Sequence, residues 1–172
     1  MGLTLLIGGA RSGKSSMAVQ AAQGSSAAVI FVATAEALDE EFERRIAHHR
    51  AERPAGWRVV EEPLALADVL FGVADEATVV IDCLSLWVAN LIGREDTSDE
   101  IADVARRTAK LAAGRNGQTY AVTNEVGMGI VPANAVARRY RDELGRVNAT
   151  WAAAADEVLL VVAGVGLPLS KP

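Results

Sequence analysis

The sequence predicts an α/β protein with a mostly parallel central sheet and helices on both faces. Apolar, strand-like runs alternate with segments in which apolar residues recur at helical spacing, which is the order of a doubly wound fold. Several of the strand-like runs are apolar throughout, as is typical of strands buried on both faces of a parallel sheet. The 172 residues contain no internal repeat, low-complexity tract or linker. We therefore expect residues 1–172 to form a single domain.

The predicted strands are short runs rich in aliphatic and β-branched residues. They are Leu3–Ile7, Ala28–Ala33, Trp57–Val60, Thr78–Asp82, Thr119–Asn124 and Glu157–Gly164, which is the last clear strand. Helical patterns fill the intervals between them. The predicted helices are Lys14–Gln23, Asp39–Glu52, a segment that begins within Pro63–Val73, Leu84–Ile92, and Asn134–Ala155.

A capping box predicts the start of one further helix. Thr97 and Glu100 have the spacing at which each side chain bonds to the backbone amide of the other. Apolar or small residues then recur on one face of the helix, at Ile101, Val104, Ala105, Thr108, Leu111 and Ala112.

Composition excludes several classes of function. The net charge is −5 and the isoelectric point is about 5.1, which argues against bulk nucleic-acid binding because that usually needs a basic face. Cys83 is the only cysteine, so no internal disulfide is possible. No apolar run approaches the roughly 20 residues of a membrane span, and the apolar start is too short for a signal sequence. We expect a cytoplasmic protein without a membrane span.

A glycine-rich phosphate loop follows the first predicted strand. The segment GGARSGKS completes the pattern G-x-x-x-x-G-K-[ST] and opens a helix, as this motif requires. Glycines let backbone amides face bound phosphates, and the helix N-terminus adds a favourable dipole. Lys14 is expected to reach the outer phosphates, and Ser15 is expected to bind Mg²⁺. The motif therefore predicts a P-loop NTPase-like, nucleotide-binding domain, and a glycine turn without a ligand is the alternative.

An acidic residue stands where a second metal ligand is needed. Asp82 ends a buried predicted strand, in a position like that of the Walker B aspartate. The alternative is that this carboxylate caps the helix that begins at Leu84. Cys83, its neighbour, is interpreted as a small buried apolar residue and not as a nucleophile.

The segment TNEVGMGIVP follows another predicted strand. Ligands of open α/β sheets bind beyond the carboxyl ends of the strands, so Asn124 and Glu125 are expected at the same sheet edge as Gly8 and Asp82. Three apolar residues then alternate with glycines, at Val126, Met128 and Ile130. This loop either contacts a large, partly apolar substrate or packs onto the protein.

The two histidines are adjacent, within the segment RRIAHHRAERP. A neutral imidazole can attack phosphorus and form a covalent intermediate, and neighbouring arginines could bind phosphates. The alternative is a solvated, charged helix. The same pair of interpretations applies to Arg138, Arg139, Arg141 and Arg146, which Asp142 and Glu143 could balance on the surface.

Four segments in this order carry a family resemblance: GGARSGKS, RRIAHHRAERP, TNEVGMGIVP and RRYRDELGRVN. Together they resemble the bifunctional adenosylcobinamide kinase and adenosylcobinamide-phosphate guanylyltransferase family of cobalamin biosynthesis. The resemblance spans the chain from Leu5 to the last strand. It implies phosphorylation of adenosylcobinamide by ATP or GTP, and then transfer of GMP from GTP to the product through a guanylyl-histidine, which releases pyrophosphate. It also implies a homotrimer.

The resemblance assigns roles to particular residues. His49 best matches the histidine that carries GMP, with His48 as the fallback, and Lys14 is catalytic. Ser15 and Asp82 would hold Mg²⁺, although a relative has glutamate where Asp82 stands. The implied nucleotide-binding residues are Gly8, Gly9, Ala10, Arg11, Ser12, Gly13, Lys14, Ser15, Thr34, Ala35, Glu36, Arg50, Ala51, Glu52, Arg53, Glu61 and Asp82.

Two other functions fit the residues less completely. One is a small-molecule P-loop kinase without guanylyl transfer, in which the histidine pair is only surface. The other is a nucleotide-dependent switch, which would bind GTP without corrinoid-dependent turnover.

Overall fold

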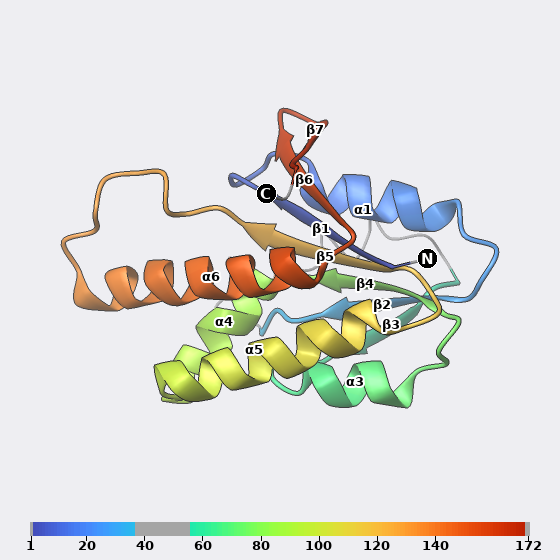
Figure 1. Ribbon diagram of the computed structural model, residues 1–172, viewed down its shortest axis with the longest axis horizontal. Coiled ribbons are helices and arrows are strands. Elements are labelled where there is room, and N and C mark those ends of the chain that lie inside the picture. Colours follow the sequence, from blue (N-terminus) through green and yellow to red (C-terminus); the bar gives the residue numbers. More distant parts are fainter. Residues whose placement is uncertain (1, 37–55, 171–172) are drawn as a thin grey trace.

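The computed structural model describes residues 2–36 and 56–170 (Figure 1). Its described strands form one seven-stranded sheet in the order β3-β2-β4-β5-β1-β6-β7, in which β7 is antiparallel to β6 and the other pairs are parallel. The strands are β1 (Leu3–Gly8), β2 (Val29–Ala33), β3 (Arg58–Glu61), β4 (Thr78–Asp82), β5 (Thr119–Asn124), β6 (Glu157–Val162) and β7 (Val165–Pro168).

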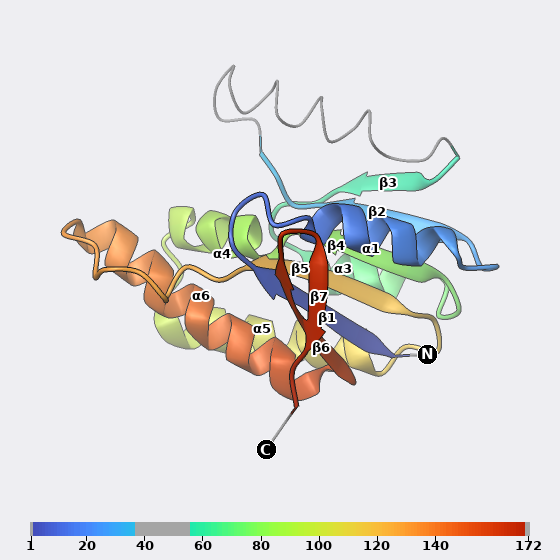
Figure 2. The same ribbon diagram turned by 90° about the horizontal axis from the view of Figure 1, so that it is seen from above.

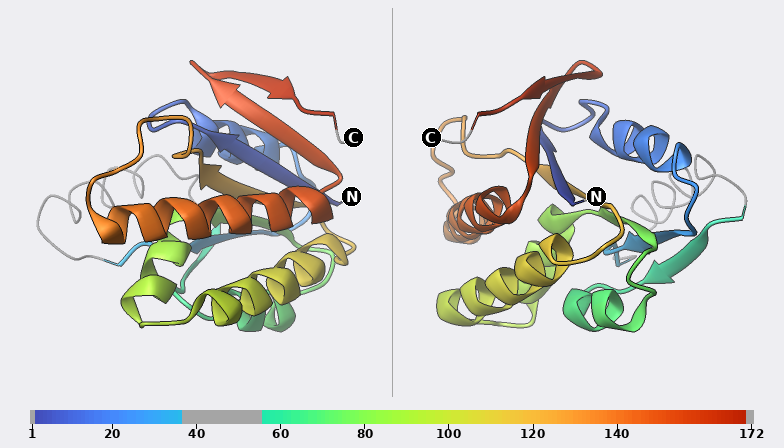
Figure 3. Two further views of the ribbon diagram at one scale, coloured as in Figure 1. Left: turned by 60° about the vertical axis from the view of Figure 1, so that its left-hand side comes forward. Right: turned by 45° about the vertical axis from the view of Figure 1, so that its right-hand side comes forward.

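Helices cover both faces of this sheet, as the sequence predicted. α1 packs on one face, over a small core that contains Ala18, Ala22 and Phe31. The other described helices share the larger core on the opposite face, around Trp87 and Trp151 (Figure 3). The helices are α1 (Lys14–Gln23), α3 (Leu66–Gly72), α4 (Leu84–Gly93), α5 (Ser98–Ala113) and α6 (Ala135–Ala154).

The central strands confirm the interpretation of their apolar runs. β2 is buried along its whole length, and β4 is buried up to Asp82. The capping box is also confirmed: the Glu100 amide donates to Thr97 Oγ1 at 3.3 Å, and the Thr97 amide donates to Glu100 Oε2 at 2.7 Å. Predicted elements and observed ones differ elsewhere by a residue or two at their ends, and the predicted helix Asp39–Glu52 lies outside the described residues.

The predicted strand Glu157–Gly164 ends two residues early, and a further strand that was not predicted follows it. β6 ends at Val162, and the chain then reverses through Ala163 and Gly164, which both have positive φ, at 50° and 79°. Positive φ at both central residues gives the twist that joins antiparallel strands in a two-residue hairpin. The turn was missed because Ala-Gly lacks the usual Asn-Gly or Asp-Gly signature.

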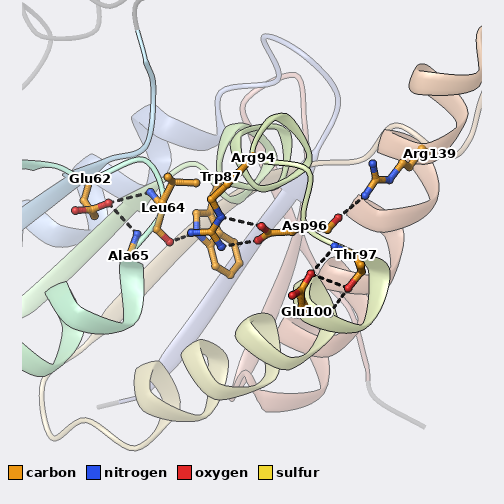
Figure 4. A network of polar contacts seen from close by, with 9 residues as sticks. All are labelled: Glu62, Leu64, Ala65, Trp87, Arg94, Asp96, Thr97, Glu100 and Arg139. Carbon is orange, nitrogen blue, oxygen red and sulfur yellow. Dashed lines mark hydrogen bonds and ion pairs between the residues drawn. The ribbon is translucent and has the colours of Figure 1, made fainter.

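Side chains of α4 and of neighbouring segments hold two connections in place, one from β3 to α3 and one from α4 to α5 (Figure 4). The Trp87 indole donates to the Leu64 carbonyl at 2.8 Å, and Glu62 Oε1 accepts from the amides of Leu64 and Ala65 just before α3. These contacts fix the connection from β3 to α3 against α4.

The connection from α4 to α5 is held in the same way. Arg94 Nε donates to Asp96 Oδ1 at 2.8 Å, and Arg139 of α6 donates to the Asp96 carbonyl (Figure 4). The hydrogen bond from the Arg94 guanidinium holds the pKa of the Asp96 carboxyl below its usual range. α6 is thereby tied to the start of α5.

Candidate nucleotide-binding site

Three strands bring the predicted site residues to one edge of the sheet. β5 lies between β1 and β4, and its register places Asn124 opposite Gly8 and Val122 opposite Asp82. The amide of Glu125 continues this pairing and donates to the Gly8 carbonyl at 3.0 Å. The phosphate loop, Asp82 and the Asn124–Glu125 pair therefore meet at the carboxyl ends of the strands, as predicted.

The backbone of the phosphate loop includes positive φ angles, which glycine adopts readily. Gly13 has φ of 96° directly before α1, and Arg11 also has positive φ, at 55°. A Cβ atom at Gly8 would lie 2.2 Å from the Val161 carbonyl oxygen, so only glycine fits between the loop and β6. No side chain caps the N-terminus of α1, which leaves its first amides available to an anion.

Lys14 lies folded against this loop. Its Nζ donates to the Gly9 carbonyl at 2.6 Å and to Ser12 Oγ at 3.3 Å, and the residue is only 6% exposed. Burial lowers the pKa of this ammonium, and the nearby carboxylate of Asp82 acts in the opposite direction. The charge is held where a bound phosphate group would need it.

The hydroxyl of Ser15 donates to Asp82 Oδ1 at 3.2 Å. A P-loop hydroxyl and a carboxylate at the end of a neighbouring strand are the protein groups that hold Mg²⁺ in P-loop NTPases. Among the described residues there is no group of three or more His, Cys, Asp or Glu side chains that could hold a metal. A hydroxyl and a carboxylate suit Mg²⁺, which takes its remaining ligands from water and phosphate groups.

The alternative role for Asp82 was that of a cap on α4. Cys83 occupies the N-cap position of α4, and no side-chain capping bond is formed there. Burial raises the pKa of the Cys83 thiol to about 11, with a further contribution from Asp82. The thiol is therefore protonated at neutral pH, in line with its interpretation as a small apolar residue and not a nucleophile.

Thr34 is fully buried beside Asp82. Its hydroxyl donates to the Cys83 carbonyl at 2.7 Å and accepts from the Cys83 amide at 2.8 Å, while its amide donates to the Asp82 carbonyl. The structure thus places Thr34 where it supports the Asp82 segment. Ala35 and Glu36 follow at the same sheet edge.

Other predicted site residues lie apart from the phosphate loop or outside the described chain. Glu61 ends β3, an edge strand that β2, β4 and β5 separate from β1. The histidine pair and the predicted nucleotide contacts Arg50, Ala51, Glu52 and Arg53 lie outside the described residues.

A buried network that sequence reasoning missed supports the end of β5. Thr123 Oγ1 donates to Asn148 Oδ1 at 2.7 Å, and Asn148 Nδ2 donates to the Asn124 carbonyl at 2.9 Å. The Asn124 amide donates to Ser85 Oγ at 2.7 Å. Asn148 belongs to the GRVN segment, which was distinctive in the sequence but gave no sign of this contact with the TNEVG segment.

The arginines of α6 make contacts within the protein, which favours their interpretation as surface residues. Arg141 pairs with Asp142 at 2.9 Å and Arg146 pairs with Glu143 at 2.7 Å. Arg138 donates to the carbonyls of Pro132 and Ala133.

The loop after Glu125 presents apolar side chains to solvent. Met128 is 83% exposed and Ile130 is 97% exposed, and Val131 and Val136 are also exposed. The loop therefore does not pack down onto the protein, which was one of its two interpretations. A surface of this kind beside a nucleotide site can accept a ligand with apolar parts.

Comparison with known proteins shows close relatives along nearly the whole chain. The profile of the family described as cobinamide kinase / cobinamide phosphate guanyltransferase matches residues 4–169. The bifunctional adenosylcobalamin biosynthesis protein CobP of Pseudomonas aeruginosa is 44% identical over 167 residues, or 96% of this chain and 95% of that protein. The bifunctional protein CobU of Escherichia coli is 41% identical over 180 residues, or 97% of this chain and 99% of that protein.

Solved structures confirm the fold class alone. An ATPase of a type III secretion system superposes with a TM-score of 0.55 at 11% identity, and the match covers 97% of this chain and 56% of that one. The RadB recombinase superposes with a TM-score of 0.53 at 16% identity, and the match covers 92% of this chain and 73% of that one. The fold is that of a P-loop NTPase. Within the described residues, no helix is long and apolar enough to cross a membrane.

Proposed function

Because this chain belongs to the cobinamide kinase / cobinamide phosphate guanyltransferase family, we propose that it phosphorylates adenosylcobinamide with ATP or GTP and then transfers GMP from GTP to the product. It is an enzyme of cobalamin biosynthesis. The observation that supports both reactions best is the assembly of Lys14, Ser15 and Asp82 around one phosphate loop.

The loop and its helix would hold the triphosphate. Backbone amides at the start of α1 would face the phosphates, Lys14 would neutralise the outer ones, and Ser15 and Asp82 would hold the metal. When bound, Mg²⁺ would neutralise negative charge on the phosphate oxygens during transfer. Lys14, fixed by Gly9 and Ser12, needs little reorganisation for this task.

For the second reaction we assign His49 as the residue that carries GMP. Two successive displacements at the α-phosphorus, first by the imidazole and then by the acceptor phosphate, replace one direct displacement between two anions. Pyrophosphate leaves in the first displacement, and adenosylcobinamide-GDP forms in the second. The support for this assignment is the match of the HHR segment to the family pattern.

Incubation with GTP labelled at the α-phosphate tests the covalent step. We expect acid-labile, alkali-stable label on the wild-type protein and on His48→Ala, but not on His49→Ala. Label lost in His48→Ala and kept in His49→Ala would move the carrier role to His48. If the wild-type protein carried no label but still phosphorylated adenosylcobinamide, the alternative function, a kinase without guanylyl transfer, would be supported instead.

The exposed loop after Glu125 suits the corrinoid, which is large and partly apolar. We expect the double variant Met128→Ser/Ile130→Ser to raise the KM for adenosylcobinamide about tenfold or more, because each lost apolar contact contributes roughly 1 kcal/mol. The KM for the nucleotide should stay unchanged. Phe71, which is 86% exposed on α3, offers a control in Phe71→Ser. Unchanged corrinoid affinity in the double variant would remove this loop from the proposal.

The proposal includes two further expectations from the family resemblance. We propose a homotrimer, which light scattering tests through the mass in solution. We also propose a cytoplasmic location, because both reactions consume nucleoside triphosphates.

A further inference from the structure

We propose that Glu125 is the general base of the kinase reaction and that the guanylyl transfer does not use it. The inference rests on the two activities proposed above. It assigns a catalytic role to a residue that follows β5 directly.

The position of Glu125 separates it from the other carboxylates at this edge. β5 pairs directly with β1, and the Glu125 amide donates to the carbonyl of Gly8, the first glycine of the phosphate loop. Glu36 follows β2 and Glu61 ends β3, and both of these strands lie further across the sheet. Asp82 accepts from Ser15 at the metal position. Of the acidic residues that the structure describes there, Glu125 alone extends from a strand paired directly with β1.

The side chain of Glu125 is held in place and is still accessible. One carboxylate oxygen, Oε1, accepts from the amide of Gly127, where an added Cβ atom would lie 2.9 Å from that oxygen. The residue is half-buried, so an incoming hydroxyl can reach it. The exposed apolar side chains at Met128 and Ile130 begin three residues later, on the surface where the acceptor would bind.

The support under Glu125 is rigid. Asn148 forms hydrogen bonds with Thr123 and Asn124, the two residues that precede Glu125. The Ser85 hydroxyl accepts a hydrogen bond from the Asn124 amide. A catalytic group is effective when neighbouring contacts fix its backbone in this way. The two distinctive sequence segments, TNEVG and GRVN, thus meet at the end of β5, directly before Glu125.

The chemistry of the two reactions differs in its need for a base. In the kinase reaction the acceptor is a neutral hydroxyl. Its oxygen bonds to the γ-phosphorus, its proton passes to the Glu125 carboxylate, and the bond from the γ-phosphorus to the bridging oxygen breaks, with the electron pair leaving on the nucleoside diphosphate. In the guanylyl transfer the acceptor is a phosphate monoester, which is already an anion at neutral pH because its second pKa is about 6.

The two activities therefore serve as internal controls for each other. We expect Glu125→Gln to lower kcat of the kinase reaction by about 10²–10⁴-fold, with the KM values for nucleotide and corrinoid little changed. Guanylyl transfer to chemically supplied adenosylcobinamide phosphate should stay within about twofold of wild type. Glu76→Gln, an exposed glutamate at the opposite end of the sheet, is the matched control and should change neither activity.

Each other outcome overturns the inference. Equal loss of both activities would show that Glu125 only supports the phosphate loop, and no loss in either would show that it has no role. If Glu125→Gln does not fold, Glu125→Asp keeps the carboxylate and should retain a weakened kinase activity beside full guanylyl transfer. A wild-type protein that lacks kinase activity would instead contradict the proposed function.

Discussion

Lys14→Met is expected to lower kcat of the kinase reaction and the rate of protein guanylylation by about 10²–10³-fold each. Nζ is fixed by the Gly9 carbonyl and by Ser12, so its charge is in place before the nucleotide binds. Methionine keeps the length of the side chain but removes that charge, so the charge on the phosphates in either transition state is left uncompensated. Single-turnover assays with γ-labelled and α-labelled GTP measure the two steps separately.

The control for this variant is Lys110→Met, an exposed lysine in the last turn of α5. It makes the same chemical change far from the site and should leave both rates within about twofold of wild type. If Lys14→Met kept more than a tenth of either rate, the phosphate loop would not serve that reaction in the proposed way.

Arg115→Met is expected to lower the free energy of unfolding by about 3 kcal/mol, because it leaves buried carbonyl groups without their charged donor. Arg115 is 8% exposed, and its guanidinium donates to the carbonyls of Leu70, Ala74 and Ala77 at 3.1, 2.7 and 2.9 Å. These contacts join the end of α3 to the start of β4. For a chain of this length, the loss corresponds to a fall of about 6–12 °C in Tm, measured by thermal denaturation.

Arg106→Met supplies the matched control. Arg106 pairs with Asp103 at 2.9 Å on the exposed face of α5, and such a pair contributes less than about 1 kcal/mol. Arg115→Lys keeps one charged donor, so its Tm should lie between those of Arg115→Met and Arg106→Met. Equal Tm values for Arg115→Met and Arg106→Met would contradict the structural role of Arg115.

The parts that sequence predicts well are those whose physical signal is local. The phosphate loop is continuous from Gly8 to Ser15, so its glycines, lysine and hydroxyl could be recognised together. Asp82 could be placed because the apolar run before it marks a buried strand, and parallel strands end at one edge of the sheet. The capping box at Thr97 is likewise complete within four residues.

The parts that were missed depend on contacts between distant segments. Asn148 is one amide on a long helix, and its bonds to Thr123 and Asn124 exist only once α6 packs beside β5. Arg115 is a charged residue in a surface-like segment, AGRNGQ, and nothing nearby indicates that three carbonyls will surround it. The final hairpin lacks the usual turn residues, so its reversal at Ala163 and Gly164 could not be separated from a longer strand.

That hairpin has a consequence for how the protein is made. The Gly164 amide donates to the Ser12 carbonyl at 2.8 Å, so the turn between β6 and β7 rests on the phosphate loop (Figure 2). Among the described strands, β1 pairs with β5 and β6, which come more than a hundred residues later in the chain. During synthesis the phosphate loop therefore gains these contacts only after the chain through Gly164 has been made, so the triphosphate site is completed late.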